Sequence, residues 1–159
     1  MGIELCYLAV LFAACPVGLF CLSTGKLDVA LDITAAESRS LALYGDAWLG
    51  GLLGGCLFSM KWLYHSIARG KWHLDRRAWR FLTPLVSAGL AFGTMALFIS
   101  GALPLFSERI TGTLPGVTGV SFLVGYFSDD TVAALAGAAT KLLRGADEKE
   151  PDVSDRGRN

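Results

Sequence analysis

The chain has 159 residues, and its composition excludes an ordinary soluble domain. Hydrophobic residues make up 53% of the sequence and charged residues only 18%, whereas a soluble domain carries about 25% charged residues. A chain of this size with a mean hydropathy of +0.49 has too little polar sequence to cover a soluble core. The formal net charge is zero, which provides no overall field to attract a nucleic-acid partner. These numbers predict an all-α integral membrane helical bundle.

Three segments are long and apolar enough to span a membrane, which takes about 20 residues of helix. They cover residues 3–22, 43–64 and 81–105. Pro16 lies inside the first segment, where neighbouring membrane helices can tolerate it. In the third segment we expect Thr83 to cap the helix and Pro84 to occupy its first position.

A fourth apolar segment, residues 114–127, is followed by Ser128, Asp129 and Asp130. Its length corresponds to only about 21 Å of helix, so a crossing segment and a re-entrant one both remain open, and we favour the crossing. The serine and the two acids suit the cap and first turn of an interfacial helix over residues 130–143. The other interpretation is a cation or proton site at the two acids. We assign residues 1–145 to one transmembrane domain and 146–159 to a disordered, charged tail.

Basic residues are unevenly distributed between the two sides of the expected bundle. Eleven of the 14 Lys and Arg residues lie in segments 61–80 and 141–159, and three lie in the two opposite connections. Because cytoplasmic loops are enriched in Lys and Arg, we expect loop 61–80 on the cytoplasmic side of a bacterial inner membrane. A re-entrant fourth segment would move the tail to the other side and weaken this bias.

Glycines recur at four-residue spacing in the second and third spans. Such spacing lets helix backbones approach closely in lipid. The pairs either form an interface between copies of the chain or pack the two spans together within one chain, and both interpretations stay open. The glycines that we expect to pack helices are Gly50, Gly51, Gly54, Gly55, Gly89 and Gly93.

Segment 61–80 interleaves aromatic and basic residues between two spans. Such patches can bind nucleic acid by base stacking, but between two spans these side chains are better placed at the lipid headgroups. We therefore expect membrane lipids with anionic headgroups as the partners of this loop. The expected interfacial residues are Lys61, Trp62, Tyr64, Arg69, Lys71, Trp72, Arg76, Arg77, Trp79 and Arg80.

The sequence contains no pattern that predicts catalysis, a metal ion or a cofactor. His65, His73 and Asp75 have no recognised ligand spacing and no accompanying Cys or Glu cluster. Thiols in apolar segments pack as small hydrophobic groups, and this applies to Cys6, Cys15, Cys21 and Cys56. Phosphate-binding and nucleophile motifs are missing as well. We expect a protein that is not an enzyme.

Two short motifs accompany the Gly-rich span. One has the form R-x-x-x-P-L and begins at Arg80, and the other has the form G-[LFY]-F-S-[DE] and begins at Gly125. With these motifs, residues 45–143 resemble a group of uncharacterised small bacterial multi-span membrane proteins. The resemblance implies a bacterial membrane location and a helical architecture, and it implies no catalytic or ligand residues.

For function, the sequence favours an assembly or scaffold module that packs through its Gly-rich helix faces. A homo-oligomer is one such assembly, and the sequence identifies no protein partner. The alternative is an oligomeric pore or an ion-conducting membrane effector. A pore requires a polar stripe along a span. The third span offers only Thr83, Ser87, Thr94 and Ser100. The first three form a weak stripe, which hydrogen bonding between helices explains equally well.

Overall fold

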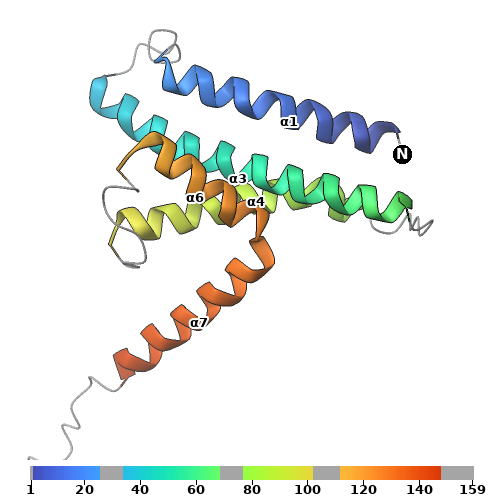
Figure 1. Ribbon diagram of the computed structural model, residues 1–159. Helices are drawn as coiled ribbons and strands as arrows, with labels where there is room; N and C mark the ends of the chain where they lie inside the picture. Colours follow the sequence, from blue (N-terminus) through green and yellow to red (C-terminus); the bar gives the residue numbers. More distant parts are fainter. Residues whose placement is uncertain (1, 26–33, 69–76, 102–111, 148–159) are drawn as a thin grey trace, which may run out of the picture. The chain divides into compact units, whose positions relative to one another are not determined.

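The computed structural model describes residues 2–25, 34–68, 77–101 and 112–147. Within these ranges the chain is all-helical, which confirms the predicted fold class. The helices are α1 (Gly2–Ser23), α3 (Ala35–Ala68), α4 (Arg77–Ile99), α6 (Leu114–Tyr126) and α7 (Ser128–Asp147) (Figure 1). Three of them, α1, α3 and α4, are long and apolar enough to cross a membrane.

The chain divides into two compact units, Met1–Ser128 and Asp129–Asn159. In the first unit α3 is the central helix, and α1, α4 and α6 pack against it (Figure 1). α1 and α4 run antiparallel to α3, whereas α6 runs parallel to it. The second unit contains α7 from Asp129 onward, an amphipathic helix with two acids in its first turn.

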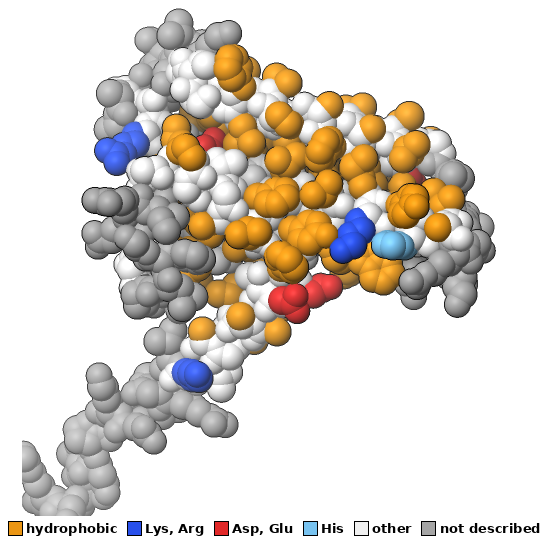
Figure 2. All heavy atoms as spheres, in the orientation of Figure 1, with side chains coloured by type: hydrophobic (Ala, Val, Ile, Leu, Met, Phe, Trp, Pro, Cys, Tyr) orange, Lys and Arg blue, Asp and Glu red, His pale blue; other side chains and the backbone are white. Residues whose placement is uncertain are grey.

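The first unit is apolar outside and partly polar inside, as expected of a protein surrounded by lipid. Figure 2 shows hydrophobic side chains spread over the visible face of the helices. α4 illustrates the pattern, because Leu82, Val86 and Phe92 are exposed. The polar residues of the same helix are buried against its neighbours, namely Arg80, Thr83, Ser87 and Thr94. The polar stripe of the third span therefore faces the interior of a single chain.

α3 begins eight residues before the predicted span 43–64, at Ala35. The cause is a capping interaction at its first turn. The Glu37 carboxylate accepts hydrogen bonds from the backbone N–H of Thr34 (3.0 Å) and from its hydroxyl (2.7 Å). This T-x-x-E arrangement is half of a capping box, which satisfies a backbone donor at the start of a helix. The signal was present in the sequence as Thr34-Ala35-Ala36-Glu37.

The prediction that α4 starts at Thr83 and Pro84 is wrong, because the helix begins at Arg77 and continues through Pro84. The Thr83 hydroxyl donates a hydrogen bond to the Trp79 carbonyl, 2.7 Å away, within the helix. Pro84 is fully buried against the rest of the bundle. Packing of this kind lets a membrane helix tolerate a proline in its interior.

The predicted break after the fourth apolar segment is present. α6 ends at Tyr126, and Phe127 alone separates it from α7. The Phe127 N–H still bonds the Leu123 carbonyl at 2.9 Å. Asp129 and Asp130 lie in the first turn of α7, and Ser128 is its first helical residue. The acids are thus at the positive end of the helix dipole, where negative charge is favourable.

Candidate functional site

The four glycines of α3 form a seam, defined here as Gly50, Gly51, Gly54 and Gly55, that packs on two different helices of the same chain. A Cβ atom built at Gly50 would lie 2.8 Å from the Thr118 carbonyl of α6. One built at Gly55 would lie 2.9 Å from the Cα of Pro84 in α4. Backbone contacts this close are possible only where no side chain intervenes. Within the described bundle, the seam therefore serves contacts inside one chain.

Gly125 of α6 packs against this seam, although in the sequence it stands out only as the first residue of the G-[LFY]-F-S-[DE] motif. A Cβ at this position would collide with the Gly51 carbonyl and lie 2.8 Å from the Gly51 Cα. Gly125 lies six residues after Gly119 and so does not form a GxxxG pair with it. For this reason glycine spacing did not mark Gly125 as a packing residue. Its role becomes visible only when α6 is placed beside α3.

The two glycines of α4 behave differently, and we call them the outward pair. Cβ atoms built at Gly89 and Gly93 would meet no atom within 4 Å. Both residues are exposed, on the apolar face of α4 that also carries Val86 and Phe92. On this face, α4 combines exposed glycine backbone with exposed apolar side chains.

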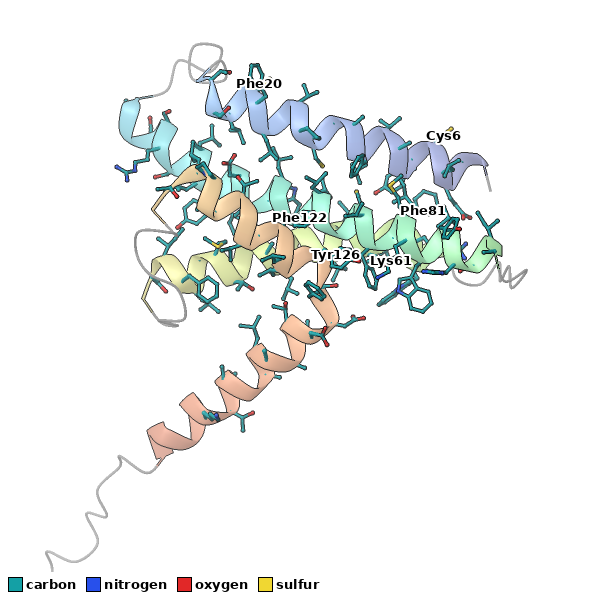
Figure 3. The ribbon with its side chains drawn as sticks, viewed as in Figure 1. Cys6, Phe20, Lys61, Phe81, Phe122 and Tyr126 are labelled. Atoms are coloured by element: carbon teal, nitrogen blue, oxygen red, sulfur yellow. The ribbon has the colours of Figure 1, made fainter. Side chains whose placement is uncertain are left out.

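Aromatic and basic residues gather beside the end of α6 and along the last part of α3. The Lys61 ammonium donates a hydrogen bond to the Tyr126 hydroxyl at 3.1 Å and lies 5.6 Å from the centre of that ring. Figure 3 shows Lys61 and Tyr126 side by side at the end of α6. The predicted interfacial residues Trp62, Tyr64 and Trp79 are exposed. This is the exposure that contact with lipid headgroups requires.

Arg80 does not fit the predicted headgroup role. It is only 8% exposed, and its Nη1 lies 3.1 Å from the Glu4 Oε2 in an ion pair between α4 and α1. A buried carboxylate in α1 requires a positive partner, and Arg80 provides one. Next to this pair, the Tyr7 hydroxyl donates to the Phe81 carbonyl at 3.3 Å.

The remaining basic-loop predictions concern residues that cannot be placed. Arg69, Lys71, Trp72 and Arg76 lie outside the described residues. Arg77 is the first residue of α4, but its side chain is likewise outside the description.

Asp46 of α3 is the second buried acid among the described residues, and it lies near the start of α6. It is 3% exposed, and its Oδ1 has no hydrogen-bond partner among the described residues. Its Oδ2 lies 3.0 Å from the Thr118 Oγ1, which itself lies 2.9 Å from the Leu114 carbonyl oxygen. Asp46 and Thr118 line a cleft of about 390 Å³ with Leu19, Phe20, Ser23, Leu114 and Pro115. In Figure 3, Phe20 marks this end of the bundle.

The described residues include no group of three or more His, Cys, Asp or Glu side chains close enough to hold a metal ion. The four cysteines are free thiols, and Cys15 and Cys56 are buried. Comparison with protein-family models, with curated proteins and with solved structures finds no match for this chain.

Proposed function

We propose that this chain is a non-enzymatic membrane protein that assembles with further copies of itself through the outward pair, Gly89 and Gly93. The observation that carries the proposal is that the glycines of α3 and those of α4 have different surroundings. Those of α3 are occupied by contacts within the chain, whereas those of α4 have open space around them. A helix face with glycines four residues apart allows two helices to approach backbone to backbone.

A second copy is the occupant best suited to this face. Two α4 helices related by a two-fold axis present the same residues to each other, so a pair of glycines on one meets the same pair on the other. The flanking side chains, Val86 and Phe92, are apolar and exposed, and they would pack around the glycine contact. An identical face requires no separate partner with complementary charge.

Size measurement of the detergent-solubilised complex tests the proposal. Gly93→Leu adds bulk at the proposed contact, and we expect the complex to fall to a smaller mass while the chain still inserts and remains helical. The matched control is Gly119→Leu, because Gly119 of α6 is also exposed with no atom within 4 Å of its built Cβ. An unchanged mass in Gly93→Leu, or an equal loss in Gly119→Leu, would refute the assembly face.

The same proposal includes a topology in a bacterial inner membrane, with loop 61–80 and its anionic lipid partners on the cytoplasmic side. α6 runs parallel to α3, with Thr118 beside Gly50 and Tyr126 beside Gly54. The contact between the long side chains of Tyr126 and Lys61 links the end of α6 to the basic end of α3, and this link supports a crossing fourth segment.

Cysteine labelling in intact cells tests this topology. On a background without native cysteines, Thr24→Cys at the end of α1 should react with a membrane-impermeant reagent. Ala68→Cys at the end of α3 should be protected, because it lies at the basic end of the bundle, and a crossing fourth segment predicts protection of Phe127→Cys as well. Labelling of Phe127→Cys together with protection of Ala68→Cys would show that α6 does not cross, and labelling of Ala68→Cys would reverse the orientation.

Three buried serine hydroxyls are the observation that favours the alternative function, an ion-conducting protein. Ser59, Ser87 and Ser121 are buried, and the hydroxyl oxygen of each has no hydrogen-bond partner among the described residues. Ser121 lies beside Gly50 and Ser87 beside Gly55, so the hydroxyls occupy successive levels along α3. Ion flux in proteoliposomes that is lost in Ser87→Ala would favour this alternative over an assembly module.

A further inference from the structure

Asp46 is buried, its Oδ1 has no hydrogen-bond partner among the described residues, and its Oδ2 contacts the Thr118 hydroxyl. The Thr118 oxygen is within hydrogen-bond distance of two acceptors, the Asp46 Oδ2 at 3.0 Å and the Leu114 carbonyl at 2.9 Å. A hydroxyl has a single proton to donate. An ionised Asp46 must share that one proton with the Leu114 carbonyl, whereas a neutral Asp46 that donates its Oδ2 proton to the Thr118 oxygen leaves the Thr118 proton for the carbonyl.

From this geometry we infer that Asp46 is a proton-binding site, a neutral carboxylic acid held by Thr118 in the cleft where α1 ends and α6 begins. The ligand is a proton exchanged with water at that end of the bundle. The site is independent of self-assembly, since its residues belong to α1, α3 and α6 and not to the outward face of α4.

The charges around the cleft support a neutral Asp46. The residues that line it from α1 and α6 are Leu19, Phe20, Ser23, Leu114, Pro115 and Thr118, and none carries a charge. α4 approaches this level of α3 with Met95, which packs in a cluster with Ala47. Arg39 of α3 does not line this cleft; it lines an adjoining one with Ser23 and Leu114. A carboxylate at such depth is costly without a positive partner.

Release of the proton has a defined consequence for the neighbouring hydroxyl. The O–H bond of Asp46 breaks, the proton passes to a water molecule, which becomes hydronium, and the carboxylate keeps the electron pair. The Thr118 hydroxyl then turns its own proton from the Leu114 carbonyl to the Asp46 Oδ2. That carbonyl belongs to the first turn of α6, so the protonation state of Asp46 is linked to hydrogen bonding at the start of this helix.

Infrared spectroscopy of the full chain in lipid nanodiscs tests the inference. A protonated carboxylic acid has a carbonyl stretch that is separate from the bands of a carboxylate. At pH 7, where an ordinary aspartate is ionised, we expect this band in the wild type. We expect it to disappear in Asp46→Asn, which keeps the shape of the side chain and a hydrogen-bond donor for Thr118. The control, Asp129→Asn, changes an exposed acid and should leave the band in place.

Two further spectra make the assignment specific. Transfer to D₂O should shift the band, because the inference requires the Asp46 proton to exchange with water. Thr118→Val removes the hydroxyl and should move the band, whereas Thr118→Ser retains the hydroxyl and should leave its position unchanged.

Three results would overturn the inference. The absence of an acid band at pH 7 would mean that Asp46 is ionised, with Arg39 as the first candidate for its partner. A band that survives Asp46→Asn would belong to another carboxyl group, such as Glu4. A band that D₂O does not shift would show that the proton cannot exchange with water.

Discussion

Arg80→Met is expected to lower the free energy of unfolding of the solubilised protein by about 3–5 kcal/mol. The substitution leaves the Glu4 carboxylate, which is 3% exposed, buried without its guanidinium partner. Breaking a buried ion pair on one side is costly because the remaining charge has lost its compensation. Denaturant titration in mixed micelles measures the change.

The double variant Glu4→Leu with Arg80→Met separates the pair from simple loss of packing. It removes both charges, and replacement of a buried pair by apolar side chains is often neutral or stabilising, so we expect much of the stability to return. Lys61→Met is the matched control for a cation at the same end. Lys61 is exposed, and its loss should cost less than about 1 kcal/mol. Equal effects of Arg80→Met and Lys61→Met would contradict a structural role for the pair.

Gly51→Ala is expected to destabilise the protein by about 1–3 kcal/mol, the usual range for overpacking. A single added methyl group at this position would collide with the Ala91 side chain and lie 2.9 Å from the Ser87 carbonyl. The Ala91 Cβ and the Ser87 carbonyl oxygen are both fixed in place by the α4 backbone, so neither can move aside by a rotamer change. The added group therefore forces α3 and α4 apart.

Gly93→Ala provides the comparison, because it introduces the same methyl group at the outward pair. No atom lies within 4 Å of that position, and alanine favours a helix over glycine by about 1 kcal/mol. The stability of the monomer should therefore be unchanged or slightly higher. If Gly51→Ala and Gly93→Ala had the same effect, the distinction between the inner seam and the outward pair would be untenable.

The helices themselves were predictable from local sequence. α6 (Leu114–Tyr126) ends within one residue of the expected segment 114–127, because two acids after a serine cannot continue an apolar span. α3 was predicted too short, since its first turns are polar and are stabilised by the Thr34–Glu37 contact and not by hydrophobicity. The start of α4 was misplaced because proline at the first position of a helix is common, whereas burial decides whether a helix tolerates an interior proline.

The candidate sites depended on contacts between distant residues. Spacing marks the glycines of both α3 and α4 as suitable for close packing, but only the placement of Ser87, Ala91 and Thr118 distinguishes the inner seam from the outward pair. Arg80 lies in a basic segment, and its buried partner is 76 positions earlier. No local pattern connects the two residues.

Disulfide cross-linking in native membranes tests the proposed assembly face most directly. The variant lacks the four native cysteines and carries Gly93→Cys, and oxidation is carried out before any detergent is added. The proposal predicts a cross-linked dimer from Gly93→Cys and none from Gly119→Cys, which places the thiol on the exposed surface of α6. Cross-linking at Gly119→Cys but not at Gly93→Cys, or at neither position, would contradict self-assembly through α4.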